Sequence, residues 1–175
     1  MEKIKRIIRH LWLDTSDAKR AIPPDLLHRL TQQVAESESN HTGQVRICVE
    51  AALPVSYLRR LGGQVGIKQL VRERAVMLFG KLRVWDTEHN NGVLIYLQLA
   101  EHAIELVADR GLSRHVQPQE WQAMTQHMGT AFGDGRFELG LSQALEEVST
   151  LLVRHFPAVE GEIRANELPN EPVIN

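Results

Sequence analysis

The 175-residue sequence predicts an α/β fold, namely a helix–sheet–helix sandwich around a small mixed β-sheet. Three observations predict it. Residues 93–99 form a nearly continuous apolar run, which is typical of a strand that helices cover on both faces. Residues 44–50 and 103–108 are two further short segments with strand-like composition. The remaining segments place apolar residues at helical spacing, which favours amphipathic helices on both faces of the sheet.

The first half of the chain supplies two helices before the first strand. Residues 4–12 place apolar side chains on one helical stripe, with basic residues around it. Pro23 and Pro24 open a second helix, because proline suits the first turn, where its missing N–H costs nothing. A polar segment at 39–43 ends this helix and leads into the strand at 44–50.

The middle of the chain completes the sheet. Residues 54–63 contain a proline and two glycines, so we expect a loop or a broken helix there. A helix over 66–82 follows, and it connects the strands at 44–50 and 93–99 into a βαβ unit. A three-residue connection separates the second and third strands, which predicts that 93–99 and 103–108 form an antiparallel hairpin.

Two further helices and a tail close the chain. Pro118 opens the first helix, a glycine-flanked turn near 133–135 ends it, and the second helix runs from about 137 to 155. After Pro157 the sequence is polar and acidic. We therefore divide the chain into an amphipathic N-terminal helical segment, one α/β domain and an acidic flexible tail, at residues 1–20, 21–157 and 158–175.

Composition restricts the class of protein. The length fits one domain with its own core, and 43% hydrophobic and 24% charged residues are ordinary for a globular domain. The single cysteine, Cys48, excludes an internal disulfide, and we expect it to be a packing residue. The N-terminal residues lack the uninterrupted apolar stretch of a secretory signal, and no apolar run is long enough to span a membrane. We therefore expect a soluble, cytoplasmic protein.

Charge is unevenly distributed along the chain. The net charge of −2 argues against a dedicated nucleic-acid-binding protein. Residues 58–83 carry seven basic and one acidic residue, whereas residues 138–175 carry seven acidic and two basic residues. This asymmetry is compatible with a protein partner or self-association, but a solvated helix face and an acidic tail explain it more simply. The basic helix within residues 1–13 can also lie on an anionic membrane surface, although we favour packing of its stripe on its own domain or on a sister subunit.

The sequence contains no nucleophile elbow, phosphate-binding loop, dinucleotide-binding turn or HExxH motif. One polar constellation stands out instead. Because the strands at 93–99 and 103–108 are antiparallel, the loop before the first lies beside the end of the second. The side chains expected to converge there are Asp86, Thr87, Glu88, Asn90, Asn91, Asp109 and Arg110.

Carboxylate and amide oxygens on flexible loops are the hard ligands that Ca²⁺ or Mg²⁺ needs. We regard the acidic and amide residues of this constellation as candidate cation ligands, and Asp134, in a glycine-flanked turn, as a further one. A cation held there can activate water, with Arg110 as the partner of a phosphate. These residues can also have purely structural roles. Asp86 can cap a turn, Asn90 and its neighbours can supply left-handed backbone, and Asp109 can pair with Arg110 or a helix N-terminus.

Several segments resemble the TPM domain family. They include WDTEHNNGVLIY at 85–96 and IELVADRGL at 104–112, whose combination is the most specific element. The other matching residues are Ala75, Leu78, Phe79, Trp121, Met128, Phe132, Gly135, Phe137, Gly140, Leu141, and those at 155–157 and 166–169. The resemblance covers roughly residues 25–157.

The resemblance implies an α/β sandwich and strengthens the hypothesis of a divalent cation near Asp86, Glu88, Asn90, Asn91 and Asp109, because calcium binding has been described in the family. One member is a thylakoid-lumen protein linked to photosystem II repair, for which acid phosphatase activity has been proposed. The resemblance implies no catalytic nucleophile.

Two departures from the family pattern matter. Many members carry a glutamate after the glycine that leads into the first strand, whereas here Gly43 is followed by Gln44. Many members also carry a signal peptide and a membrane anchor, so this chain looks like a short soluble branch. We expect a protein that binds a divalent cation where the loop before the strand at 93–99 meets the end of the strand at 103–108, with metal-assisted phosphate-ester hydrolysis as its activity. The competing hypothesis is a non-catalytic protein- or membrane-interaction module.

Overall fold

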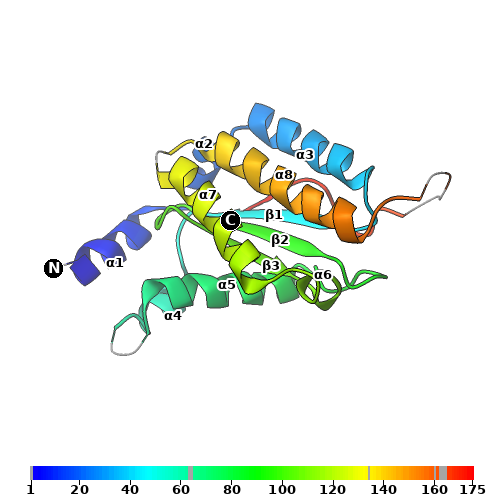
Figure 1. The fold of residues 1–175 in the computed structure, drawn as a ribbon. Coiled ribbons are helices and arrows are strands. Elements are labelled where there is room, and N and C mark those ends of the chain that lie inside the picture. The colour runs from blue at the N-terminus through cyan, green and yellow to red at the C-terminus, as the bar shows by residue number, and fades with distance from the viewer. Residues whose placement is uncertain (1, 63–64, 134, 160, 162–164) are drawn as a thin grey trace.

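A computed structural model shows helices on both faces of one four-stranded sheet (Figure 1). It describes residues 2–62, 65–133, 135–159, 161 and 165–175. The predicted α/β sandwich with a small mixed sheet is therefore confirmed. The helices are α1 (Glu2–Trp12), α2 (Thr15–Ala21), α3 (Pro24–Glu38), α4 (Val55–Leu58), α5 (Ile67–Lys81), α6 (Arg110–Ser113), α7 (Pro118–Gly133) and α8 (Phe137–His155).

The sheet has the strand order β3-β2-β1-β4. Its strands are β1 (Val45–Glu50), β2 (Val93–Gln98), β3 (Ala103–Ala108) and β4 (Val173–Ile174). β1 and β2 are parallel, as the βαβ prediction requires, and Val45 pairs with Val93. β2 and β3 form the predicted antiparallel hairpin, in which Val93 pairs with Ala108. The amino ends of β1 and β2 and the carboxyl end of β3 therefore lie at one end of the sheet.

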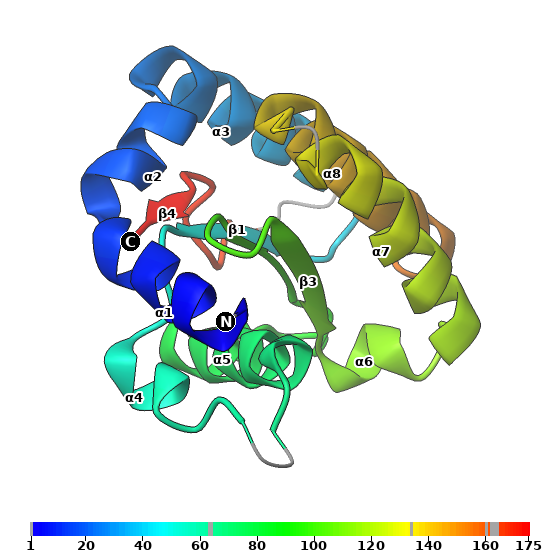
Figure 2. The same cartoon turned by 90° about the vertical axis from the view of Figure 1, so that its left-hand side faces the viewer.

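Alternate residues of the strands supply two separate cores. Ile47 and Ile95 face α2, α3, α7 and α8, which cover one side of the sheet (Figure 2). Cys48 and Tyr96 face α4 and α5 on the other side. Every residue of β2 is buried, which explains its continuous apolar run.

A charged group is enclosed in the second core. Glu50 is buried, and its carboxylate accepts hydrogen bonds from the Arg74 guanidinium of α5 and from the Tyr96 hydroxyl, the latter at 2.6 Å. Burial and the nearby Glu50 carboxylate raise the pKa of Tyr96 well above its usual value. The buried carboxylate is therefore fully partnered, as a charge in an apolar core must be.

The C-terminal segment differs from the flexible tail that its polar composition predicted. Cys48 and Val49 of β1 pair with β4, and the Ala51 N–H donates to the carbonyl of Asn175 at 3.0 Å. Leu168 is buried against the second core. A strand of two residues is too short to show a periodic pattern. Its partner β1 lies more than a hundred residues earlier in the chain, so no local signal indicates the pairing.

The apolar stripe of α1 packs on its own domain only in part, and packing on a sister subunit stays a prediction. Ile7 packs against the second core, but the other four apolar side chains of the stripe are exposed to solvent: Ile4, Ile8, Leu11 and Trp12. Most of the stripe therefore does not pack on its own domain. Within the part of the chain that the structure describes, no helix combines the length and apolarity needed to cross a lipid bilayer.

Candidate functional site

The hairpin brings two loops together at one end of the sheet. The Asp109 N–H donates to the carbonyl of Gly92 at 2.9 Å, and the Gly111 N–H donates to the carbonyl of Asn90 at 2.7 Å. The loop that precedes β2 and the start of α6 are thus joined through their backbones. We call this region, residues 86–92 and 109–111, the loop rim.

The close approach of these loops requires glycine. A Cβ atom added to Gly111 would lie 2.4 Å from the Asn90 carbonyl oxygen and 2.7 Å from that of His89. A Cβ atom added to Gly92 would lie 2.0 Å from the carbonyl oxygen of Val84. These contacts with backbone atoms cannot be relieved by a rotamer change, so the two glycines fix the shape of the loop rim.

Asn91 lies at the centre of the loop rim and is fully buried. Its backbone N–H donates to the Thr87 hydroxyl at 3.2 Å, and its side-chain Nδ2 donates to the Thr42 hydroxyl at 3.2 Å. Its side-chain oxygen Oδ1 is buried and has no hydrogen-bond partner among the described residues. The hydrogen bond of Nδ2 therefore fixes the orientation of the side-chain amide, while Oδ1 accepts no hydrogen bond from the described residues.

Asp109 shows the same pattern on the facing loop. It is 6% exposed and is the N-cap of α6, where Oδ1 accepts from the Arg110 N–H at 2.6 Å. Its other oxygen, Oδ2, is buried and has no hydrogen-bond partner among the described residues. A buried acceptor without a partner costs about 1–3 kcal/mol, and more when it is charged. Two such oxygens on joined loops require an explanation.

The other predicted site residues lie at the surface. Asp86 forms an ion pair with Arg83, and Glu88 is exposed. Asn90 adopts left-handed backbone, with φ of 51°, and its side chain is exposed. The Arg110 side chain is 78% exposed, and its Nε lies 4.0 Å from Asp109 Oδ1.

The structure thus brings Asn91 and Asp109 into the interior of the loop rim and leaves the other candidates around it. Asp134 lies outside the described residues. Among the residues that are described, no group of three or more histidine, cysteine, aspartate and glutamate side chains is arranged to hold a metal ion. Any cation site at the loop rim would therefore depend on amide or backbone oxygens as well as carboxylates.

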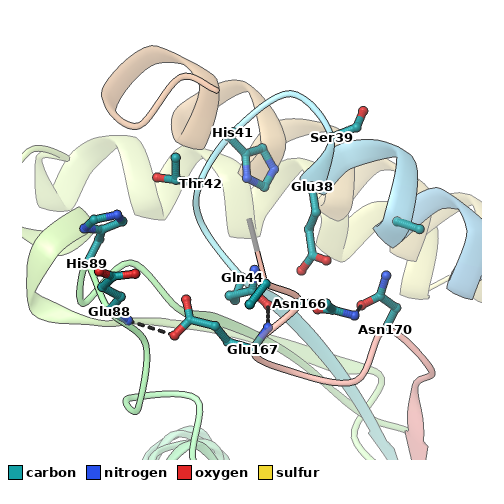
Figure 3. Close-up of a pocket in the computed structure, with 12 residues that line it drawn as sticks. Glu38, Ser39, His41, Thr42, Gln44, Glu88, His89, Asn166, Glu167 and Asn170 are labelled. Carbon is teal, nitrogen blue, oxygen red and sulfur yellow. Dashed lines mark hydrogen bonds between the residues drawn. The ribbon is translucent and has the colours of Figure 1, made fainter. Parts of the chain in front are cut away.

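A pocket of about 600 Å³ adjoins the loop rim (Figure 3). It lies between the end of α3, the start of β1 and the segment 165–170, and Thr42, Glu88 and His89 line the side toward the loop rim. The Glu88 N–H donates to the Glu167 carboxylate at 2.9 Å, so the C-terminal segment is tied to the loop rim.

Glu38, at the end of α3, points into this pocket (Figure 3). Its carboxylate accepts from the Val45 N–H at 2.8 Å, and the side-chain amide of Asn170 lies 3.2 Å from its other oxygen. Burial raises the pKa of Glu38 to about 7. The sequence offered no signal for this residue, because its burial depends on the C-terminal segment.

His41 also lines the pocket, and it is 1% exposed. Its Nδ1 lies 3.1 Å from the carbonyl of Gly43, which can only accept, so Nδ1 carries the ring proton. Its Nε2 then accepts from the Ser37 hydroxyl at 2.9 Å. These two contacts hold the connection between α3 and β1 beside the loop rim.

Comparison with known proteins identifies the family. The sequence profile described as the TPM domain matches residues 15–151, which is most of the chain. The chain belongs to the TPM domain family. Comparison with curated proteins gives no match. The NMR structure of the BA42 protein from the psychrophilic bacterium Bizionia argentinensis is similar, with a TM-score of 0.66 and 24% identity over 83% of this chain and 90% of that chain. This likeness supports the fold alone.

Gln44 has a defined role in this TPM domain. It is buried, and its side-chain oxygen accepts from the N–H groups of Glu167 and Leu168, both at 3.0 Å. The residue that departs from the expected family glutamate therefore anchors the C-terminal segment. A carboxylate could accept the same two bonds, so the departure at Gln44 removes a negative charge and retains the acceptor.

Proposed function

We propose that the loop rim binds a divalent cation, with Asn91 Oδ1 and Asp109 Oδ2 as ligands. The observation that carries the proposal is that both oxygens are buried and lack hydrogen-bond partners among the described residues. Backbone hydrogen bonds join the two loops that hold them. A cation would satisfy both oxygens at once and would offset the cost of burying the Asp109 charge.

The chemistry of these atoms fits a hard cation. Ca²⁺ and Mg²⁺ are bound by carboxylate, amide, backbone carbonyl and water oxygens, and both accept a small number of protein ligands supplemented by water. Glu88 and Asn90 are exposed on the same loop and are candidates for further ligands. Sulfur and imidazole ligands, which zinc prefers, are absent from the proposed pair.

The test is a Ca²⁺ and Mg²⁺ titration of the metal-stripped full chain, followed by backbone amide NMR. We expect saturable shifts confined to residues 86–92 and 109–111. The decisive variant is Asp109→Asn, because asparagine caps a helix as well as aspartate does but lacks its charge. This variant should retain the fold and bind the cation about tenfold or more weakly. Asp86→Asn is the matched control, since Asp86 is exposed and paired with Arg83.

Each outcome is decisive for the proposed pair. A flat titration of the unmodified protein up to millimolar cation would overturn the proposal. Equal affinity in Asp109→Asn, with an intact fold by circular dichroism, would remove Asp109 from the ligand set. If Asp86→Asn weakens binding as much as Asp109→Asn does, the effect is the general loss of negative charge and the proposed pair is wrong.

Phosphate-ester hydrolysis is the activity that we propose for this site. A bound divalent cation polarises a phosphoryl oxygen and lowers the pKa of bound water. Arg110 supports this activity, because its guanidinium is largely exposed beside Asp109 and guanidinium groups bind phosphates. We expect cation-dependent turnover of p-nitrophenyl phosphate that is lost in Asp109→Asn and reduced in Arg110→Ala. Cation binding without turnover would leave a non-catalytic binding module.

A further inference from the structure

Helix α1 presents its apolar face to solvent. Ile4, Ile8, Leu11 and Trp12 are 63%, 47%, 61% and 82% exposed, and their spacing places them on one side of the helix. We call these four residues the outer stripe. An amphipathic helix in a globular domain ordinarily turns such a stripe toward the core. Helix α1 has the opposite orientation. Two questions follow, namely which contacts hold α1 in this orientation and what its outer stripe binds.

The cause is a set of polar contacts on the inner side of α1. His10 is buried, and its Nδ1 accepts from the Leu53 N–H at 3.0 Å, so Nε2 carries the ring proton. His10 Nε2 then donates to the Glu101 carboxylate at 3.0 Å, and Arg6 Nε lies 3.0 Å from the same oxygen. Arg9 donates to the carbonyl of Ala100 at 3.0 Å. Rotating the helix to bury the outer stripe would break all of these contacts.

Positive charge surrounds the outer stripe. Residues 3–13 contain Lys3, Lys5, Arg6 and Arg9 and no acidic residue. Lys3, Lys5 and Arg9 have no carboxylate partner among the described residues.

The basic segment at 58–83 is different, because four of its arginines are paired with carboxylates. These pairs are Arg60–Glu73, Arg72–Glu105, Arg74–Glu50 and Arg83–Asp86. Exposed apolar surface and unneutralised positive charge therefore coincide on α1.

We propose that α1 binds an anionic lipid surface, with the outer stripe inserted among the acyl chains and headgroups and Lys5 near the lipid phosphates. A short helix with an apolar face, flanking basic residues and an exposed tryptophan has the features of an interfacial helix. A second copy is a poorer partner, because two α1 helices packed face to face would bring their positive charges together.

The position of α1 suits this role. It packs against Ala100 and Glu101, in the turn that follows the carboxyl end of β2, whereas the loop rim precedes the amino end of β2. Figure 1 shows α1 extending from the body of the domain at the end opposite α6, and in Figure 2 α1 lies nearest the viewer. A domain bound to a membrane through α1 would hold its loop rim away from the lipid.

The test is co-sedimentation of the full chain with vesicles of phosphatidylcholine alone and of phosphatidylcholine mixed with phosphatidylglycerol. We expect binding to the anionic vesicles that weakens with added salt, and little binding to the neutral ones. Ile8→Ser/Leu11→Ser should reduce binding about tenfold or more, because it removes half of the outer stripe without touching the inner contacts. Val76→Ser/Val153→Ser is the matched control, since both valines are exposed elsewhere.

Charge is tested by Lys5→Glu, with Lys68→Glu on α5 as its control. We expect Lys5→Glu alone to weaken binding to anionic vesicles. Circular dichroism would confirm that each variant is folded. Failure of the unmodified chain to bind anionic vesicles would overturn the proposal, and so would equal binding by Ile8→Ser/Leu11→Ser. A dimer in analytical ultracentrifugation that this double variant abolishes would assign the outer stripe to a second copy instead.

Discussion

Replacing Glu38 with glutamine should make the protein more stable at alkaline pH but not at acidic pH. Burial raises the pKa of Glu38 from 4.5 to about 7 in the folded protein. Between these two values the folded state holds a proton that the unfolded state has released. The free energy of unfolding therefore decreases as the pH rises through this window, and the loss is complete above the folded-state pKa.

The magnitude follows from the shift. A difference of one pKa unit corresponds to about 1.4 kcal/mol, so a shift from 4.5 to about 7 corresponds to at most about 3–4 kcal/mol. Glu38 retains some contact with solvent, and the resulting screening reduces this to roughly 1–2 kcal/mol. Glutamine keeps the oxygen that accepts from the Val45 N–H and removes the ionisation. The gain in stability should therefore be near zero below pH 5 and reach its full value near pH 8.

Urea unfolding of the two proteins across this pH range, followed by far-ultraviolet circular dichroism, measures the difference directly. Subtracting the free energy of unfolding of the parent from that of Glu38→Gln at each pH cancels the contributions of all other carboxylates, provided that their environments are unchanged. Glu36→Gln is the control, because Glu36 is exposed on the same helix and its replacement should leave the pH dependence unaltered. A difference between Glu38→Gln and the parent that does not vary with pH would refute the reasoning.

Three further outcomes follow from the packing. Gly111→Ala should lower the free energy of unfolding by about 2 kcal/mol or more, because the added Cβ would clash with the Asn90 carbonyl. Gly80→Ala should raise the free energy of unfolding by about 0.5–1 kcal/mol, because nothing lies near its added Cβ. Urea unfolding measures both effects. Arg74→Met should cost about 3–5 kcal/mol in the same assay, because it leaves the Glu50 carboxylate buried without its cation. Burial raises the pKa of the Cys48 thiol to about 12, so a thiol reagent should modify it only at the rate of unfolding, and rapid labelling of the folded protein would contradict this.

Most of the fold could be predicted because its signals are local. The apolar run at 93–99 and the short connection after it identified β2 and the hairpin, and the strand at 103–108 has the predicted bounds. The helix expected at 66–82 is observed at Ile67–Lys81. The two-residue strand β4 could not be found in this way, because its position is determined by pairing with β1 rather than by its own sequence.

The location of the loop rim could be predicted from the sequence, but the burial of its individual side chains could not. Its location followed from antiparallel pairing, and the left-handed backbone of Asn90 followed from its residue type. Burial distinguishes the candidate cation ligands, because Asn91 and Asp109 are enclosed whereas Asp86 and Glu88 are exposed. That distinction depends on how α6 and the loop before β2 fit together, which no spacing in the sequence encodes.

Helix α1 illustrates why a periodic pattern does not determine its own orientation. The pattern at 4–12 indicates a helix with an apolar side, and that helix is present. Which side faces the domain was decided by His10, whose two ring nitrogens are both used in buried hydrogen bonds. Breaking these bonds would leave the Leu53 N–H and the Glu101 carboxylate without their histidine partner inside the protein, whereas an exposed isoleucine or tryptophan causes a smaller and more diffuse loss. The polar contacts therefore prevail, and most of the apolar stripe remains at the surface.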